Sequence, residues 1–176
     1  MKNTPETEAF VDKSKDVDTH GEERVFGEFL HKNGLKFTPA RRQLLRAIFS
    51  IHEHFTADQL LERLKDLGIG ASKATVYRTL GVMLSCDLLE MHDFGEGARY
   101  YEHTFGHPHH DHLFCVNCKR ISEFRDDRIE DLQKQISTRL GFALLSHTLK
   151  IYGLCRACRE DPATQQRHSA VALHRG

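Results

Sequence analysis

The sequence predicts an α+β protein, in which an N-terminal winged helix-turn-helix domain precedes a C-terminal α/β dimerisation domain with a four-cysteine zinc site. Two observations lead to this fold class. Helical patterns fill residues 22–85 and run into a hairpin signal, which is the order of elements in a winged helix. Two Cys-x-x-Cys pairs then enclose a strand, a helix and a strand.

Composition narrows the class of protein. The chain has 176 residues, no formal net charge and 39% hydrophobic residues, which is typical of a globular protein. No apolar stretch approaches the roughly 18 residues of a membrane span, so we expect no membrane association. The N-terminus lacks the apolar core of a secretory signal, which predicts a cytoplasmic protein with reduced thiols. Thirteen histidines and no tryptophan are the main anomaly.

Domain boundaries follow from breaks in these patterns. Residues 1–20 are polar and aperiodic, which predicts a disordered tail. We assign residues 21–104 to the winged helix, and residues 105–160 to the metal-binding dimerisation domain. A glycine and a proline interrupt the pattern at this boundary. Residues 161–176 read as a polar tail.

The first domain is predicted to contain four helices. The first spans residues 22–32, and the next three begin at hydroxyl side chains that can cap a helix. These caps are Thr38, Thr56 and Ser72. Two strands at 88–93 and 98–103 follow, joined by a glycine-rich turn.

The fourth helix is the candidate DNA reader. Its apolar stripe is Val76, Leu80, Met83 and Leu84. The opposite face is Ala74, Arg78, Gly81 and Ser85, with Thr75 and Tyr77 at its edges. Small residues around one arginine would let the helix enter a major groove, where arginine pairs with guanine. An ordinary exposed helix face is the alternative.

The second domain begins with strands at 112–116 and 120–124. A helix over 128–140 follows, with an apolar face formed by Ile129, Leu132, Ile136 and Leu140. A strand is predicted over 142–152.

The cysteines give the most specific signal. Cys115 and Cys118 form one pair, and Cys155 and Cys158 the other. Four thiolates suit tetrahedral Zn²⁺, and a site closed in this way is structural. A redox pair or disulfides fit less well, because there are two pairs and the compartment is reducing. Cys86 reads as a plain buried thiol.

A histidine-rich run suggests further metal sites. In an extended segment, His109 and Asp111 point to one side, and His110 and His112 to the other. Imidazole and carboxylate ligands suit Fe, Zn, Ni or Mn. Additional candidate ligands are Glu102, Glu123, Glu130 and His147. The alternatives are a hydrophilic loop for the run and a core residue for His147.

Enzymatic signals are weak. The chain has no His-Glu-x-x-His, Gly-x-Ser-x-Gly or P-loop motif, and four of its five cysteines lie in the pairs. We therefore expect no enzymatic activity, with a metal-dependent hydrolase as the alternative.

Six segments, in this order, resemble the ferric uptake regulator family. They are Leu35–Arg41, Ala74–Leu80, His109–His112, Cys115–Cys118, Glu123–Phe124 and Cys155–Cys158. The resemblance covers residues 24–160.

The resemblance implies three metal sites. The four paired cysteines would hold structural zinc. A regulatory site joining the two domains would comprise His54, Glu102, His110, His112 and Glu123. A further site in the dimerisation domain would comprise His109, Asp111, Glu130 and His147. The spacing from Glu102 to His110 is one residue longer than in the family, so His103 is an alternative to Glu102.

The resemblance also implies a homodimeric, metal-dependent repressor of metal-uptake genes that binds an AT-rich palindromic operator in double-stranded DNA. The resemblance implies that Tyr77 and Arg78 work in the major groove and Lys36 in the minor groove. From the residues themselves, Ser72 and Thr75 at the N-terminus of the fourth helix, and Arg41 at the start of the second, are further candidate DNA contacts. Fe²⁺ is the expected signal, and Fe²⁺ or Mn²⁺ would serve in vitro. Peroxide-sensing members resemble one another in using Asp where this chain has Glu123, and zinc-sensing members tend to place a cysteine in the regulatory site. A zinc-, manganese- or peroxide-responsive member is the alternative.

Overall fold

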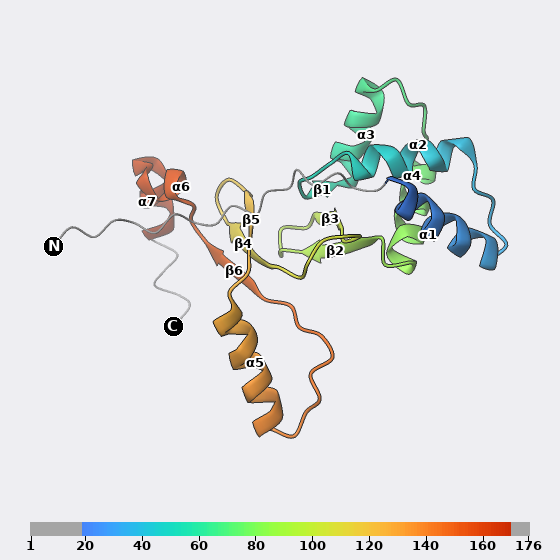
Figure 1. The fold of residues 1–176 in the computed structure, drawn as a ribbon. Helices are drawn as coiled ribbons and strands as arrows, with labels where there is room; N and C mark the ends of the chain where they lie inside the picture. The colour runs from blue at the N-terminus through green and yellow to red at the C-terminus, as the bar shows by residue number, and fades with distance from the viewer. Residues whose placement is uncertain (1–18, 170–176) are drawn as a thin grey trace. The chain divides into compact units, whose positions relative to one another are not determined.

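The computed structural model describes residues 19–169, and the chain divides into two compact units between His107 and Pro108 (Figure 1). The division lies three residues beyond the predicted boundary. The predicted tail at 1–20 lies outside the described residues, except for its last two, which begin the first helix. In the described part of the chain, no helix has the length and apolarity needed to cross a membrane.

Unit 1 contains four helices and a small sheet. Its elements are α1 (Thr19–Lys32), α2 (Pro39–Phe49), β1 (Phe55–Thr56), α3 (Ala57–Asp66), α4 (Lys73–Ser85), β2 (Leu89–Asp93) and β3 (Arg99–His103). The strands follow the order β1-β3-β2, and both pairings are antiparallel. The four helices and the hairpin match the predicted winged helix. The strand β1 was not predicted, because two residues are too few to show a period.

Side-chain caps fix where three of these helices begin. The Thr38 hydroxyl accepts a hydrogen bond from the N–H of Arg41 at 3.3 Å. Thr56 forms a capping box with Gln59, in which each side chain binds the other's backbone N–H. Ser72 caps α4 through the N–H of Thr75 at 3.2 Å.

The core of unit 1 lies between the helices and the hairpin. Its fully buried side chains include Phe26, Leu30, Leu44, Ile48, Leu60, Val76, Leu80, Met83 and Leu88. Three of the four predicted α4 core residues are fully buried, whereas Leu84 is partly buried. Packing this face inward turns the opposite face of α4 outward.

Unit 2 is a three-stranded sheet with three helices. Its elements are β4 (Asp111–Cys115), β5 (Ile121–Phe124), α5 (Asp127–Arg139), β6 (Lys150–Gly153), α6 (Arg156–Glu160) and α7 (Pro162–Ser169). The central strand β4 is antiparallel to β5 and parallel to β6. The parallel pairing requires a long crossover, which α5 and the following loop supply.

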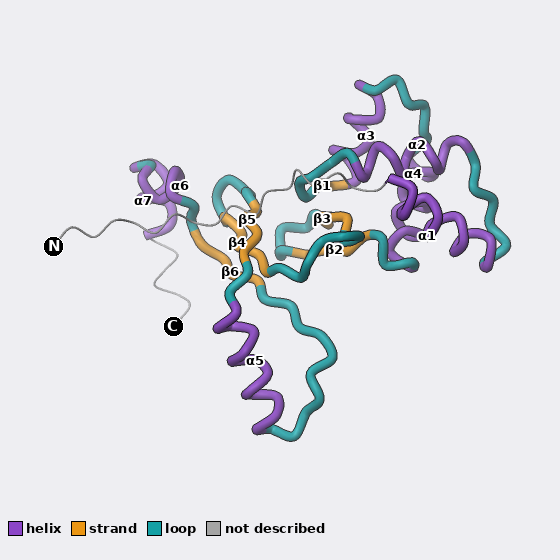
Figure 2. The backbone as a smooth tube through the Cα atoms, in the orientation of Figure 1, coloured by secondary structure: helices purple, strands orange, loops and turns teal. Residues whose placement is uncertain are grey.

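One prediction for unit 2 was wrong. The strand expected over 142–152 is confined to β6, and a long loop precedes it (Figure 2). The residues predicted as a polar tail from position 161 include the helix α7, and those after 169 lie outside the described range. Within α7, Thr164 is fully buried and bonds to Asp161. The sequence shows no apolar pattern for α7, because the residue that this helix buries, Thr164, is polar.

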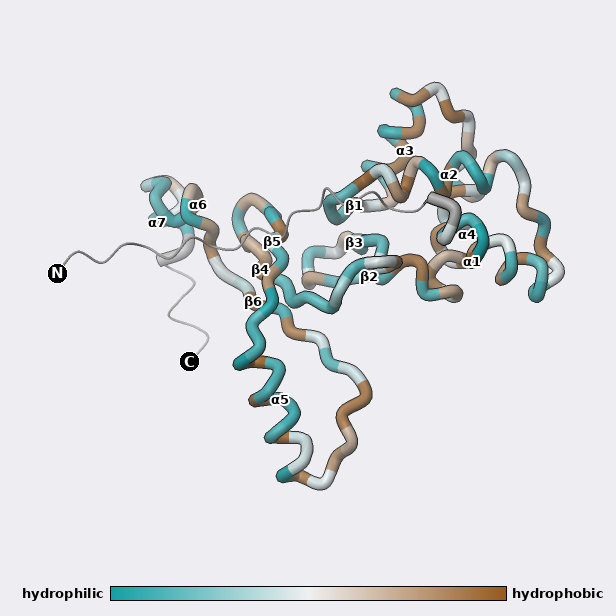
Figure 3. The backbone as a smooth tube through the Cα atoms, in the orientation of Figure 1, coloured by the Kyte–Doolittle hydropathy of each residue, from teal (hydrophilic) through white to brown (hydrophobic). Residues whose placement is uncertain are grey.

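The apolar face of α5 is not buried by the described residues of unit 2. None of the helix's residues is buried, and hydrophobic stretches continue from α5 into the following loop (Figure 3). Large exposed side chains here are Leu132, Ile136, Leu140, Phe142, Leu144 and Leu145, to which β6 adds Ile151 and Tyr152.

Candidate metal centres

Four cysteines converge at one end of the unit 2 sheet. Cys115 ends β4, and Cys118 follows in the turn to β5. Cys155 and Cys158 lie at the start of α6 and within it. The four sulfurs lie within 4.8 Å of one another, and the Cys118 and Cys155 sulfurs are 3.7 Å apart. Tetrahedral zinc with Zn–S bonds of 2.3 Å requires sulfurs about 3.8 Å apart, so the set fits zinc.

The electrostatics of this cluster also favour a cation. Burial opposes ionisation of Cys115, but N–H groups of Cys155, Cys118 and Asn117 donate to its sulfur and lower its pKa to about 6. The N–H of Arg120 favours the Cys118 thiolate, yet burial and the neighbouring thiols raise the pKa of Cys118 to about 12. Crowded thiols therefore resist joint ionisation, and a divalent ion would remove that conflict.

An amide supports the cluster from outside the ligand set. The Asn117 side chain donates to the Cys158 sulfur and to the Thr164 hydroxyl, both at 3.2 Å. A donor of this kind holds a thiolate in place and spreads its charge. Sequence reasoning missed Asn117, although its position between the two cysteines of one pair was visible.

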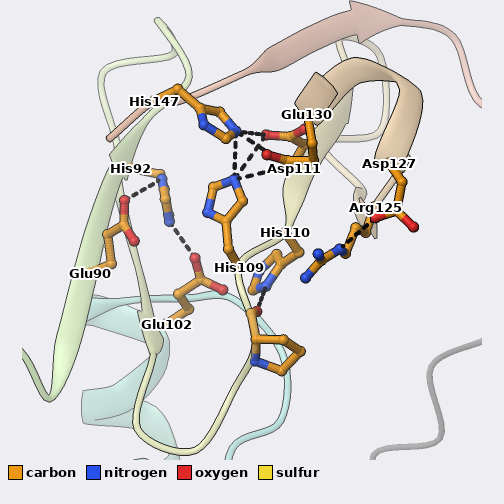
Figure 4. Close-up of polar contacts among 11 residues, drawn as sticks. Glu90, His92, Glu102, His109, His110, Asp111, Arg125, Asp127, Glu130 and His147 are labelled. Carbon is orange, nitrogen blue, oxygen red and sulfur yellow. Dashed lines mark hydrogen bonds and ion pairs between the residues drawn. The ribbon is translucent and has the colours of Figure 1, made fainter. Parts of the chain in front are cut away.

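A second set lies on the β4–α5 side of unit 2. Figure 4 shows His109, Asp111, Glu130 and His147 pointing toward one another. The Nε2 atoms of His109 and His147 are 2.7 Å apart. The Glu130 carboxylate lies 3.7 Å from His109 and 3.5 Å from His147. All four of the residues predicted for this site are thus in one place.

The donor chemistry of this set fits a metal ion. The Asp111 side chain is 2% exposed, and its Oδ1 has no hydrogen-bond partner among the described residues. This oxygen lies 3.6 Å from His109 Nε2 and 3.7 Å from His147 Nε2. Ligands 2.0–2.2 Å from one ion are about 3–3.5 Å apart, which is close to these separations. A cation here would satisfy the carboxylate and both imidazoles.

In unit 1, His54 and Glu102 of the predicted regulatory set are in contact. His54 precedes β1 and Glu102 lies on β3, and His54 Nε2 is 3.2 Å from Glu102 Oε2. Their side chains are 5% and 9% exposed. The alternative ligand His103 comes next on the strand, and its ring packs instead against Phe49 and His107. Of the two candidates, the contact with His54 favours Glu102.

Unit 2 brings together the other three predicted ligands. His112 on β4 is the register partner of Glu123 on β5. His110 Nε2 lies 3.9 Å from Glu123, and the rings of His110 and His112 are 5.0 Å apart. His109 and Asp111 belong to the other set, as the predicted alternation requires.

The exposed face of α4 carries the predicted reading residues. Tyr77 is 45% exposed and Arg78 is also exposed, while Val76 and Thr79 on the other side are buried. A Cβ added at Gly81 would meet nothing within 4 Å. The face therefore presents one arginine and one tyrosine among small side chains.

Basic residues before and at the start of α2 differ in their partners. Lys36 is exposed, and the Arg41 guanidinium donates to its carbonyl at 2.7 Å, which ties the two together. Arg42, the next residue, is paired with Glu23, and its guanidinium lies over the Phe37 ring. The side chain of Arg42 therefore links α2 to α1.

Comparison with known proteins decides the family. Residues 32–152 match the ferric uptake regulator family. The chain belongs to that family. The ferric uptake regulation protein of Escherichia coli is 39% identical over 135 residues, which are 75% of this chain and 90% of the relative. Members of the family are metal-responsive transcriptional regulators, and so is this chain.

Solved structures agree with the fold. The iron-bound regulator of Francisella tularensis is 35% identical, has a TM-score of 0.66 and covers 72% of this chain and 96% of its own. The Helicobacter pylori ferric uptake regulator, described as having three functional metal-binding sites, is 25% identical with a TM-score of 0.72. It covers 80% of this chain and 95% of its own.

Proposed function

We propose that this ferric uptake regulator family member is an Fe²⁺-dependent repressor of metal-uptake genes. The observation that carries the proposal is the chemistry of the regulatory ligands. His54 with Glu102, and His110 and His112 with Glu123, offer imidazoles and carboxylates but no thiolate. Such ligands suit Fe²⁺ or Mn²⁺ and permit exchange with the cell's metal pool.

One ion would take ligands from both units in this proposal. Binding then favours whichever arrangement of the units presents all of the ligands, because a ligand shifts a population toward the state it binds best. A fixed arrangement of two reading helices in a dimer would match two half-sites of an operator. The set of His109, Asp111, Glu130 and His147 would hold a second ion within the dimerisation domain.

The DNA contacts we propose lie on α4 and before it. Arg78 and Tyr77 would enter the major groove, while Lys36 would reach the minor groove. Ser72 and Thr75, at the N-terminus of α4, and Arg41 would contact phosphates. An AT-rich palindrome suits this arrangement, because a narrow minor groove attracts lysine. A regulator of this kind works in the cytoplasm, where the DNA is.

Dimerisation would cover the apolar face of unit 2. Leu145 is 94% exposed and Phe142 is 73% exposed, which is unusual for side chains of this size. A second copy of the chain would bury them together with the α5 face. Such an obligate interface is rich in apolar side chains.

Operator binding across a series of metals tests the proposal. We expect Fe²⁺ or Mn²⁺ to raise the affinity of the zinc-loaded protein for a palindromic AT-rich duplex about 5–150-fold. His54→Ala and His110→Ala should each abolish that gain, and His31→Ala, on the exposed side of α1, should not. Metal-dependent binding that survives in both variants would refute this mechanism. Operator binding that ignores added metal would indicate a zinc-stapled interaction module. Turnover that His110→Ala abolishes, without operator binding, would indicate a hydrolase.

A further inference from the structure

We propose that unit 1 binds a divalent cation by itself through His54, His92 and Glu102. His92 belongs to none of the predicted sites. This inference rests on the proposed function, because it adds a ligand to the regulatory site and an order to its assembly.

Three elements of unit 1 bring the ligands together. His54 precedes β1, His92 lies on β2 and Glu102 lies on β3. His92 Nε2 is 2.5 Å from Glu102 Oε1, and His54 Nε2 is 3.2 Å from Oε2 of the same carboxylate (Figure 4 shows the contact of His92). The two imidazole rings lie 5.7 Å apart. Both nitrogens therefore face one carboxylate.

The spacing of these atoms is close to that of a coordination shell. The three ligand atoms lie within 4.8 Å of one another. Ligands about 2.1 Å from an ion and at right angles to each other are about 3 Å apart. Two imidazoles and one carboxylate on one side of an ion form the facial triad that binds Fe²⁺ and leaves positions open.

The burial of these three side chains favours a bound cation. The side chains of His54, His92 and Glu102 are 5%, 2% and 9% exposed. A carboxylate this deep must be neutralised, and a divalent ion bound beside it would do so.

The surroundings of His92 also resemble those of a metal-bound imidazole. Glu90 Oε1 is 4.0 Å from Nδ1, on the side of the ring away from Glu102. Glu90 is half exposed. A carboxylate on Nδ1 favours the tautomer that leaves Nε2 available for metal. The Phe94 ring lies beside the His92 ring, with 6.0 Å between the ring centroids.

An order of events follows. The three unit 1 residues would hold the ion first, and the unit 2 residues of the proposed regulatory set would be the ones to complete its ligand shell. The metal would thus be captured before the units are locked, and the first step would set the sensitivity to metal.

The test uses the full-length, zinc-loaded protein with His109, His110 and His112 changed to alanine. This background removes both unit 2 imidazoles of the regulatory set, His110 and His112, and weakens the second set, which keeps Asp111, Glu130 and His147. We expect Co²⁺ to bind this variant, and its absorption spectrum reports the binding. Adding His92→Ala or His92→Gln should lower the Co²⁺ affinity about 10–100-fold. Adding His31→Ala should leave the affinity unchanged. The glutamine can donate to Glu102 but cannot replace an imidazole ligand. If His92→Gln binds Co²⁺ as well as the background does, His92 only positions Glu102 and the proposal is wrong.

A second measurement does not depend on how the variants fold. In wild-type protein with ¹⁵N-labelled histidine, Zn²⁺ should shift the Nε2 resonance of His92 together with that of His54. An unshifted His92 resonance, when His54 has shifted, would overturn the proposal. Both measurements are independent of operator binding, so they can succeed or fail separately from the proposed function.

Discussion

Replacing Asn117 with alanine should weaken zinc binding without touching a zinc ligand. The Asn117 amide donates to the Cys158 sulfur at 3.2 Å, and in the zinc-bound protein that sulfur would be a thiolate. A hydrogen bond to a charged group contributes about 1.5–3 kcal/mol. We therefore expect zinc affinity to fall about 10–100-fold, which is the usual effect of losing an outer-shell partner.

Asn117 has a second role that must be separated from the first. Its amide also donates to Thr164, which is fully buried and bonds to Asp161 at 2.6 Å. Thr164→Val removes this second contact and keeps the first. We expect it to lower the thermal stability of α7 and to change zinc affinity much less than Asn117→Ala does.

Competition with a chromogenic chelator measures zinc affinity in each variant. Asn33→Ala is the matched control, because its side chain donates to a backbone carbonyl of α1, at 2.8 Å, and lies in unit 1. The reasoning fails if Asn117→Ala holds zinc as tightly as the wild type. It also fails if Thr164→Val loses zinc just as readily, since the effect would then come from packing.

Four other changes give separate expectations. Thr38→Ala should cost about 1 kcal/mol through loss of the α2 cap, and an unchanged melting temperature would contradict the capping role. Gly81→Ala should raise stability toward urea by about 0.5–1 kcal/mol, since a Cβ there meets open space. Arg78→Ala should weaken operator binding by about 1–3 kcal/mol and leave metal affinity intact, as gel shifts and metal titrations would show. The Arg128 side chain and N–H lower the pKa of Asp126 to about 2. The contribution of ionised Asp126 to folding stability should therefore be complete above its ordinary pKa of 3.8, and it should disappear as the pH falls through 2. Carboxyl NMR should report this titration, and Arg128→Ala should move it upward.

Local signals explain why so much of unit 1 was predictable. Thr38, Thr56 and Ser72 each bind a backbone N–H within the next three residues, so the sequence itself marks where those helices begin. The apolar stripe of α4 then determines which face of the helix is exposed, and this is the face that we propose contacts DNA. The alternation of His109 to His112 was equally local, because a strand turns successive side chains to opposite faces.

Longer-range features were beyond the sequence. His92 and Glu102 are not direct partners in the β2–β3 register, where Glu102 pairs with Glu90 and His92 with Tyr100. Only the folded hairpin brings their side chains together. Thr164 and Asn117 meet across 47 positions in the sequence. No periodic pattern encodes either contact.

The wrong strand at 142–152 has a different cause. Its apolar residues suggested burial within the chain, yet Leu145 is almost fully exposed there. A hydrophobic pattern records burial in the functional assembly, and the partner here is a second copy in our proposal. The pattern was therefore informative about the interface and misleading about the strand.

The two kinds of ligand set divide the work of a sensor. Among the described residues of unit 2, the buried apolar side chains are those of Phe114, Cys115 and Cys158. A core this small needs a permanently bound metal ion to stabilise the fold. Four thiolates around zinc fill its coordination shell and leave no open position for another ligand. In the function we propose, the signal is read by weaker oxygen and nitrogen ligands, which would release metal when its concentration falls. Placing both functions on one ion would force a choice between a stable fold and a responsive one, so separate sites with different ligand chemistry follow from the physics of the small domain.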